Sequence, residues 1–568
     1  MFARVRAVIN GLEQRLRRPV GAPSTCLVYV VLAIAAGCLY FDPFSVAPRD
    51  AVPIYILHSD DFPYLSSSRT LPRALANAFR PHNTHVAPAW RLVCWGASAT
   101  AGKLANLPPV LAVVSFGALV ALMLIAGRFV ARETSSVATG CVVAAVLGCS
   151  SVMTSAVTWF SAGQTIWASL GILASLRWLQ RYRRNQHLRW LVAGSIAAGL
   201  AGWFWTVGYA AGVAGALYLI GDERPRVRRR AFAPVLGVLL AAGLAFGLGA
   251  SKIDARVSFH GRTTREAFDP VAGTLHCAQA LVENLLLGNL GLTGETTIAQ
   301  AVVLSTAAAA CYLWIGAGAR RFNSLALAGL GLLAASSWVE WSVRGYLPFS
   351  SLRGIVPWYD VIPDVGLVLF VAGWSRGTRA PIEHAPPRSL TLGRMLAMFA
   401  LAVALVVEHR QRVEHYWASR VAVLTPSERE RFPVEHLRRL RTNSLAMQRA
   451  EWQMRHLMKL DRAEARAWQL GITREDIARA FGRIDAPNLA PVYDVLDLLD
   501  LPAPSQTKPP LDVAFVRDEL IEFFRVEPEP RPVWVPSNVE WPPPPAKPDV
   551  ARDEEDRRRF FSAVGGMN

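Results

Sequence analysis

The chain has 568 residues, of which 52% are apolar and 18% are charged, and its mean hydropathy is +0.26. Ordinary soluble domains are smaller and carry about 25% charged residues, so this composition excludes a single soluble domain. The net charge of +17 belongs to residues 1–408, which hold 35 Lys and Arg against 18 Asp and Glu, whereas residues 409–568 hold 25 of each. A charge excess confined to the apolar part indicates the lipid bilayer, and not nucleic acid, as the partner.

Uncharged apolar runs divide the first 408 residues. They are 21 to 43 residues long, and about 20 helical residues cross a bilayer core, so each run holds one or two membrane spans. The two longest, 134–176 and 190–221, have room for two spans each, with turns predicted near 159–164 and 203–206. Single spans are predicted near 19–41, 104–127, 231–251, 296–318, 322–339, 357–375 and 390–407.

The sequence therefore predicts an all-α polytopic membrane protein with about eleven transmembrane helices. Basic residues cluster in every second connecting segment, where 23 basic and 5 acidic residues occur, against 12 and 13 in the intervening segments. The basic clusters of these segments are 4–18, 128–132, 177–189, 224–230, 320–321 and 376–394, and the segments also include the flanking Glu133, Asp222 and Glu223. Because cytoplasmic loops are enriched in Lys and Arg, this alternation places the N-terminus inside and the C-terminus outside.

The three long segments outside the predicted spans fall on the outer side. The first outer loop, about 42–105, is far longer than a connector requires, so we expect it to be structured and functional. A second outer loop covers about 251–295, and both belong to a transmembrane domain over 1–408. Residues 409–500 are predicted to form a helical extracytoplasmic domain, and 501–568 a proline-rich tail that is extended or disordered.

The pattern of the tail is specific enough to predict where its helices end. Apolar residues recur at helical spacings over 437–460, and Gly471 ends the run. Thr473 and Asp476 form a capping box for a further helix that continues through Phe481. A DNA-binding helix-turn-helix has a similar pattern, but the zero net charge and the outer location of the tail argue against it.

Two adjacent carboxylates, Asp60 and Asp61, follow the first predicted span. Neighbouring like charges raise the pKa of one group and attract cations, so such a pair can supply a general base or hold a divalent metal ion. An ordinary polar loop is the competing interpretation.

Further along this loop, Arg80, His82, His85 and Arg91 occur within twelve residues. Pro81 suits the first position of a short helix, on which the two histidines would share a face. Two imidazoles on one face can bind a metal ion or donate to a phosphate, and the arginines add fixed positive charge. The candidate phosphate ligands are Arg80, His82 and Arg91. The candidate ligands for a divalent metal ion are His82, His85 and Asp61. Surface histidines without a function are the alternative.

These features of the loop resemble the GT-C superfamily of membrane glycosyltransferases, which includes protein mannosyltransferases and lipid A aminoarabinose transferases. The resemblance covers about 20–408 and rests on an inside N-terminus, the long outer loop with Asp60 and Asp61, and a histidine-rich stretch that ends in Pro88 and Arg91. In that family an acidic residue of this loop activates the acceptor hydroxyl, and a polyprenyl-phosphate sugar is the usual donor. The resemblance implies Asp60 or Asp61 as the base, and the cytoplasmic (inner) membrane of a bacterium as the location.

A late outer segment carries a second group of charged and aromatic residues. Arg344, Tyr346 and Arg353 can bind a lipid-linked phosphate, since the donor head group lies at this depth. Asp360 and Asp364 share a helical face at the entrance of a weakly hydrophobic span, where carboxylates are costly unless they face a polar cavity. Interfacial anchoring within an aromatic belt explains the two carboxylates equally well.

Two classes of function stay open. As an enzyme, the protein transfers a hexosyl or pentosyl group from a polyprenyl-phosphate donor to an unidentified acceptor, with inversion expected from a single displacement. As a non-enzyme, it is a transporter or an envelope assembly component whose outer tail recruits partners. Transport predicts clear internal repeats and ionisable residues near the bilayer midplane. The sequence shows neither, because its ionisable residues lie at span ends, and it therefore favours the glycosyltransferase.

Overall fold

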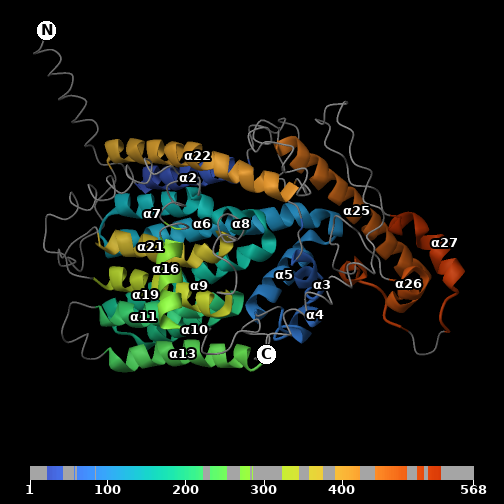
Figure 1. The fold of residues 1–568 in the computed structure, drawn as a ribbon, viewed down its shortest axis with the longest axis horizontal. Helices are drawn as coiled ribbons and strands as arrows, with labels where there is room; N and C mark the ends of the chain where they lie inside the picture. Colours follow the sequence, from blue (N-terminus) through green and yellow to red (C-terminus); the bar gives the residue numbers. More distant parts are fainter. Residues whose placement is uncertain are drawn as a thin grey trace, which may run out of the picture. The chain divides into compact units, whose positions relative to one another are not determined.

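The computed structural model describes residues 22–41, 57, 60–82, 85–221, 231–252, 269–281, 285, 323–344, 357–374, 391–421, 442–482, 495–504 and 509–525. Contacts divide the chain into one unit over Met1–Glu529 and a second over Pro530–Asn568, none of which is described. Within these ranges every extended regular element is a helix (Figure 1). The predicted all-α class is therefore confirmed for the part of the chain that the structure describes.

The helices fall into two consecutive series. The first comprises α2 (Ala22–Phe41), α3 (Asp61–Ser66), α4 (Leu71–Ala76), α5 (Pro88–Ala101), η1 (Leu104–Asn106), α6 (Leu107–Glu133), α7 (Val137–Cys149), η2 (Ser151–Met153), α8 (Thr154–Thr158), η3 (Phe160–Gly163), α9 (Gln164–Asn185), α10 (Leu188–Phe204), η4 (Thr206–Tyr209), α11 (Ala210–Ile220) and α13 (Phe232–Ala250). The second comprises α16 (Pro270–Ala280), α19 (Ser324–Arg344), η6 (Pro357–Asp360), α21 (Val361–Trp374), α22 (Leu392–Val421), α25 (Thr442–Leu470), α26 (Arg474–Phe481), η7 (Val495–Leu498) and α27 (Val513–Phe524).

Helices occupy the positions of the predicted spans, except that 296–318 is not among the described residues. In the described ranges, α6, α13, α19 and α22 are long and apolar enough to cross a membrane, and α7 joined to the bent η2–α8 segment can form a fifth crossing. The helices α2, α10, α11 and α21 are apolar but shorter. The predicted turns also occur, because the chain leaves the helical conformation at Trp159 and again at Trp205. These features are compatible with a helical membrane protein.

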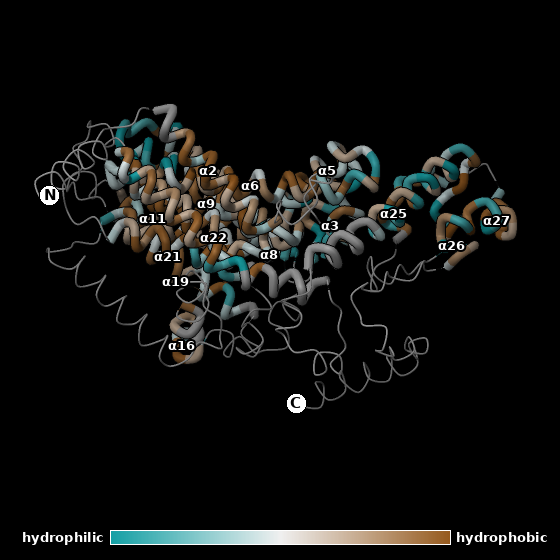
Figure 2. The backbone as a smooth tube through the Cα atoms, turned by 90° about the horizontal axis from the view of Figure 1, so that it is seen from above, coloured by the Kyte–Doolittle hydropathy of each residue, from teal (hydrophilic) through white to brown (hydrophobic). Residues whose placement is uncertain are grey.

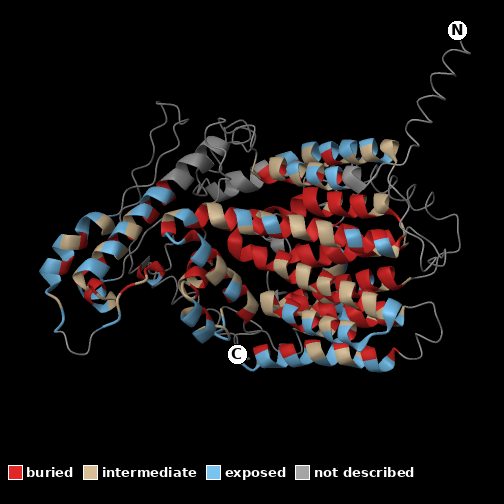
Figure 3. Cartoon of the chain, turned by 180° about the vertical axis from the view of Figure 1, so that it is seen from behind, coloured by how far each residue is buried: buried red, intermediate tan, exposed pale blue. Residues whose placement is uncertain are grey.

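Exposed apolar side chains cover the outward faces of the bundle helices. On α10 the exposed residues Leu188, Val192, Ile196 and Leu200 recur every four positions, which aligns them along one side of the helix. The peripheral helices α13 and α22 have most of their apolar windows exposed, whereas those of α6 and α19 are about half buried (Figure 3). Figure 2 shows the same concentration of hydrophobic residues along the bundle. Continuous apolar surface of this extent matches the requirement for contact with lipid.

Small residues allow the bundle helices to approach closely. A Cβ atom on Gly140 of α7 would lie 2.3 Å from the carbonyl oxygen of Gly127 on α6. A Cβ atom on Gly329 of α19 would lie 2.3 Å from the backbone nitrogen of Phe370 on α21. Such close backbone approach is a common way to pack helices in lipid, where burial of apolar side chains gives little driving force.

The bundle has two chemically different ends, and α9 runs from one to the other. At the end that we call the basic end (128–133 and 177–190), Arg184 donates to the carbonyl of Arg132 at 3.4 Å, so the last turns of α6 and α9 adjoin. At the end that we call the polar end (57–106, 150–165 and 205–209), Asp61 accepts hydrogen bonds from Ser161, which precedes α9. The polar end carries most of the predicted site.

The tail helices α25 and α26 follow the predicted boundaries. The helix α25 ends at Leu470, and Gly471 then adopts a φ of +66°, a conformation that favours glycine. The capping box is present, since Asp476 N–H donates to Thr473 Oγ1 at 3.3 Å and Thr473 N–H donates to the Asp476 carboxylate at 2.9 Å. The helix ends at Phe481, as the sequence predicts.

One expectation about the tail is corrected. The span predicted near 390–407 lies in α22, whose apolar part is Leu392–Arg410 and which continues to Val421. The segment 501–568 is not extended throughout, because α27 (Val513–Phe524) is a helix within it. Residues 511–526 contain no proline, and the Asp512 side chain caps the first turn through Ala514 N–H at 2.6 Å. The surrounding prolines dominate the composition and conceal this short helical stretch.

Candidate functional site

The helix α3 places Asp60 and Tyr64 beside His82 at the polar end. Asp60 precedes the first turn of α3, and its Oδ1 lies 3.4 Å from His82 Nε2. The ring of Tyr64 packs against the imidazole with centroids 4.6 Å apart. The side chains of His82 and Asp60 are 15% and 30% exposed, so this carboxylate–imidazole pair is accessible from outside the fold.

Asp61 has the opposite environment, although it is adjacent in sequence. It is fully buried, and its Oδ1 accepts hydrogen bonds from Ser161 N–H at 2.8 Å and from Ser161 Oγ at 2.6 Å. Ser161 belongs to η3, in the turn between α8 and α9. The buried carboxylate therefore attaches α3 to the tip of the α7–α9 hairpin, and the acidic pair divides into an accessible member and a structural member.

Arg91 connects two parts of the same loop from its buried side. Its guanidinium is buried, donates to Ser67 Oγ and to the carbonyl of Arg80 at 3.1 Å, and lies 5.3 Å from the centroid of the Tyr64 ring. Burial lowers the pKa of Arg91, and burial likewise raises the pKa of the Tyr64 phenol, which stays protonated. Arg91 thus fixes the loop from inside, whereas the side chain of Arg80 is exposed.

The histidines do not share a helical face, which corrects the prediction of a short helix after Pro81. His82 and His85 form an isolated antiparallel bridge through two backbone hydrogen bonds of 2.9 and 3.0 Å. Their rings have different neighbours, since His82 faces Asp60 whereas His85 Nδ1 lies 3.1 Å from Thr206 Oγ1. The helix instead begins at Pro88, which occupies the first turn of α5.

This arrangement does not assemble the predicted metal set. No three His, Cys, Asp or Glu side chains in the described ranges lie together as ligands for a metal ion. His82 pairs with Asp60, and His85 is directed to Thr206, while Asp61 is bound to Ser161. The divalent metal predicted from His82, His85 and Asp61 therefore has no preformed site there.

Ring contacts connect the first loop to the late outer segment. His85 packs on Trp205 with centroids 4.0 Å apart, and Trp205 in turn lies 5.8 Å from the ring of Tyr359. The next residue, Asp360, and Asp364 one turn later are both buried at the start of α21. The start of α21, with Tyr359 just before it, therefore lies near the polar end.

The side chains of the remaining predicted residues of that segment lie outside the described part of the chain. Tyr346 and Arg353 are not among the described residues, and Arg344 ends α19 with a side chain that is not described. The predicted phosphate ligands Arg344, Tyr346 and Arg353 therefore stay predictions.

The tail forms part of the same structure, because it shares a hydrophobic core with the first loop. Leu57 and Trp90 of the loop cluster with Trp452, Leu457 and Ile477 of the tail. The side chain of Gln453 forms two hydrogen bonds with the backbone of Leu57, accepting from its N–H at 3.0 Å and donating to its carbonyl at 3.2 Å. This pairing lies three residues before Asp60.

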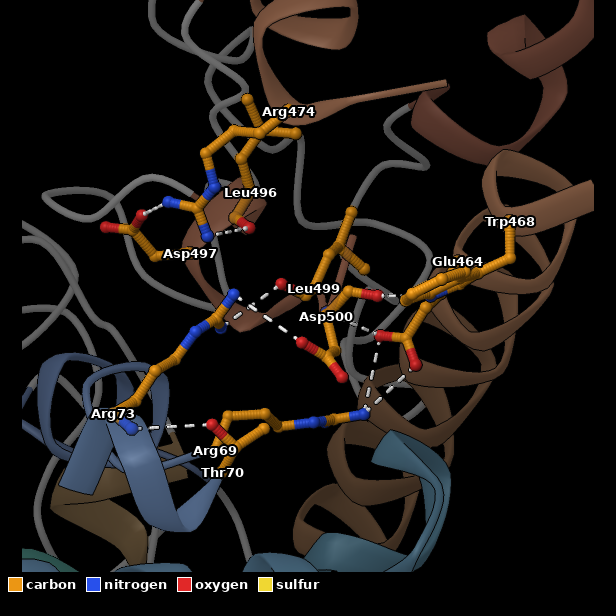
Figure 4. A network of polar contacts seen from close by, with 10 residues as sticks. All are labelled: Arg69, Thr70, Arg73, Glu464, Trp468, Arg474, Leu496, Asp497, Leu499 and Asp500. Carbon is orange, nitrogen blue, oxygen red and sulfur yellow. Dashed lines mark hydrogen bonds and ion pairs between the residues drawn. The ribbon is translucent and has the colours of Figure 1, made fainter. Parts of the chain in front are cut away.

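Polar contacts continue this attachment away from the core (Figure 4). Asp461 accepts from Leu104 N–H at 2.7 Å and from Ala105 N–H at 3.0 Å, which caps η1. Arg69 pairs with Glu464 at 3.4 Å, and the Glu464 carboxylate also accepts from Asp500 N–H at 2.9 Å. Arg73 donates to the carbonyl of Leu499 at 3.5 Å and pairs with Asp500 at 3.6 Å, so two neighbouring turns of the loop are held by the tail.

Sequence reasoning missed Tyr64, Ser161, Thr206 and Gln453 as members of this region. A signal existed for Ser161, because the hairpin tip 150–165 carries eight Ser, Thr and Gln residues within an otherwise apolar run, and all eight are buried. Gln453 had no such signal, since nothing in the sequence indicates that a residue of the tail pairs with Leu57.

Comparisons with family models, curated proteins and solved structures found no match for this chain.

Proposed function

We propose that the chain is an integral membrane glycosyltransferase that transfers a hexosyl or pentosyl group from a polyprenyl-phosphate donor to an acceptor hydroxyl. The observation that supports this most directly is the accessible Asp60–His82 pair at the end of an apolar helix bundle. A carboxylate in contact with an imidazole is a common arrangement for accepting a proton from a hydroxyl. Its position at the ends of the helices suits a donor whose lipid lies in the bilayer and whose sugar lies outside it.

In the proposed reaction Asp60 is the general base. The acceptor hydroxyl gives its proton to the Asp60 carboxylate as its oxygen bonds to C1 of the sugar. The bond between C1 and the phosphate oxygen breaks, and its electron pair leaves with the polyprenyl phosphate, so the configuration at C1 is inverted. Asp61 is a positioning residue, because its carboxylate is buried and bound to Ser161.

The donor phosphate is assigned to the accessible basic residues of the loop. Arg80 has an exposed side chain, and the His82 imidazole can donate an N–H to a phosphate oxygen. Arg91 supports them from inside, because its terminal nitrogens already donate to Ser67 and Arg80. The predicted contributions of Arg344, Tyr346 and Arg353 remain part of this proposal.

The proposed orientation is eleven spans in a bacterial inner membrane, with the polar end and the tail extracytoplasmic. It rests first on the alternation of basic segments along the sequence. It rests also on the position of α3, η3 and η4, which lie together at the polar end, whereas Arg132 and Arg184 lie at the basic end. A reporter that is active only in the cytoplasm should therefore be silent when it is fused after Asn568. Clear activity of that fusion would contradict the orientation.

The assignment of the base is tested by two matched substitutions. Asp60→Asn should lower transfer from radiolabelled polyprenyl-phosphate hexoses or pentoses by about 10²–10⁴-fold, because Asn cannot accept the proton. Its thermal stability should match that of the parent, since the Asp60 side chain is partly exposed. Asp61→Asn should instead lower stability by about 1–2 kcal/mol, because two charge-assisted hydrogen bonds become neutral.

The pair of variants separates chemistry from folding. Full transfer activity in Asp60→Asn would remove Asp60 from the base role. Full activity in the double variant would reject the acidic pair as the base and favour the non-enzymatic alternative. A common loss of stability in both single variants would instead contradict the division into accessible and structural carboxylates.

A further inference from the structure

Four arginines gather at the basic end, away from the proposed catalytic site. Arg128 and Arg132 lie on the last turns of α6, and Arg181 and Arg184 lie on the last turns of α9. The contact between Arg184 Nη2 and the carbonyl of Arg132 joins the two turns, and the positive charges of Arg184, Arg181 and Arg128 all act on Arg132. The side chains of Arg128, Arg132 and Arg184 are exposed.

The nearest described carboxylate does not neutralise this group. Glu133 pairs with Arg183 at 3.7 Å, accepts from the Tyr218 hydroxyl at 2.8 Å, and accepts from the amide of Gln180. No ion pair links any of the four arginines to an acidic side chain within the described ranges. Helix C-termini favour cations, but that effect is limited to fractions of a unit charge per helix. Within the part of the chain that the structure describes, the cluster therefore retains unneutralised positive charge.

A rigid aromatic pair lies beside the arginines. The indoles of Trp178 on α9 and Trp190 on α10 stack with centroids 5.1 Å apart and an angle of 8° between their planes. The Arg181 guanidinium lies 4.7 Å from the centroid of one ring and 4.9 Å from the other, and Arg189 lies 4.6 Å from Trp190. Stacking fixes the Arg181 side chain, and tryptophans commonly lie at the level of lipid head groups.

From this geometry we propose that Arg128, Arg132, Arg181 and Arg184 bind the phosphate of an anionic phospholipid head group. A planar guanidinium can hold two phosphate oxygens at once, so adjoining arginines can surround a phosphate from two sides. The phosphate relieves the repulsion among the four charges, and the Trp178–Trp190 stack contacts the glycerol and upper acyl region. The site depends only on a bilayer at this end and not on the proposed transferase reaction.

The test uses the full-length protein in detergent and measures binding of dioleoyl phosphatidylglycerol by native mass spectrometry, with dioleoyl phosphatidylcholine as the neutral lipid. The double variant Arg132→Gln, Arg184→Gln should bind phosphatidylglycerol roughly 25-fold more weakly than the parent, at about fivefold for each basic residue near an anionic surface. The matched control is the double variant Arg462→Gln, Arg525→Gln, which removes the same charge from exposed arginines of the tail and should bind like the parent.

Three further readouts decide the source of the phosphate and the integrity of the variant. Without lipid, the Arg132→Gln, Arg184→Gln variant should unfold at the same temperature as the parent or higher, because repulsion is removed. Preference of the parent for phosphatidylglycerol over phosphatidylcholine supports the proposal, and equal binding of both overturns it. Displacement of the lipid by an equal concentration of glycerol 3-phosphate would assign the site to a soluble phosphate ester and overturn the lipid assignment. Unchanged lipid binding by the variant would also overturn the proposal.

Discussion

The two ends of the bundle handle charge in different ways. At the polar end, charged and polar groups are drawn inward and paired by segments that are far apart in sequence, as in the bonds of Leu57 with Gln453 and of Leu104 with Asp461. At the basic end, the clustered arginines lie on adjoining helix termini, and Arg128, Arg132 and Arg184 remain exposed. The polar end is therefore organised by long-range contacts and the basic end by neighbouring helices.

This difference relates to what each end is proposed to do. A base and a phosphate donor need fixed positions, because small displacements of reacting groups cost large factors in rate. The tail supplies that fixation for the loop that carries Asp60. Attraction of a lipid head group needs positive charge at the correct depth and tolerates more freedom. We therefore expect the polar end to be sensitive to substitutions in the tail, and the basic end to be insensitive to them.

The largest expected effect is the loss of the core shared by loop and tail. Leu457 is fully buried in that core, so Leu457→Ala should cost about 2–5 kcal/mol of stability at the polar end. The adjacent Met458 is 46% exposed, and Met458→Ala should stay within about 0.5 kcal/mol of the parent. Limited proteolysis should show faster cleavage of 57–106 in the first variant only. Equal cleavage in both variants would contradict a tail that holds the loop.

A smaller effect is expected from the two hydrogen bonds that fix Leu57. Gln453→Ala leaves the Leu57 N–H and carbonyl without these partners, at a total cost of about 1–3 kcal/mol. Activity should fall through a higher KM or lower kcat, because Asp60 loses its support, while phosphatidylglycerol binding at the basic end stays unchanged. Gln469→Ala, on the exposed side of the same helix, should alter neither quantity. A change in lipid binding for Gln453→Ala would show that the two ends are coupled.

Local patterns were enough to predict much of the fold. Runs of uncharged residues located the bundle helices, and breaks in those runs located the turns at Trp159 and Trp205. The boundary at Gly471 and the capping box at Thr473 were also readable, because both depend on residues within one turn of the chain. The helix α27 was missed because composition was averaged over a proline-rich stretch longer than the helix itself.

The candidate site was only partly predictable, because local patterns identify candidate residues but not their distant partners. The acidic pair and the histidines were found from residue type and proximity in sequence. Their division of roles was not, because it depends on Ser161, which lies 100 residues beyond Asp61, and on Thr206 beside His85. The expected helix after Pro81 failed because backbone bonds between His82 and His85 close a tight turn there. The contacts of Asp61 with Ser161 and of His85 with Thr206 join residues 100 and 121 positions apart, so local patterns do not indicate which residues pair.

The smallest expected effect concerns the Arg69–Glu464 pair at the edge of the loop–tail contact. Burial raises the pKa of Glu464 above its ordinary 4.5, and the nearby Asp461 and Asp500 act in the same direction. Arg69 and the hydrogen bond from Asp500 N–H act in the opposite direction without cancelling the increase. The folded protein therefore holds this proton more tightly than the unfolded chain.

Because the folded pKa is the higher one, the stabilisation from Glu464 is fully present below about pH 4.5 and is lost as the pH rises through the folded pKa. We expect Glu464→Gln to remove this slope, with a change of about 1 kcal/mol or less at neutral pH, as for other partly exposed ion pairs. Thermal unfolding of the parent and the variant at a series of pH values between 4 and 7.5 measures the pH dependence of stability that Glu464 contributes. Glu475→Gln, which removes an exposed carboxylate on α26, should leave the slope in place. A difference between parent and Glu464→Gln that grows in favour of the parent as pH rises would mean that the ion pair with Arg69 outweighs burial, and that charge at this edge stabilises the polar end.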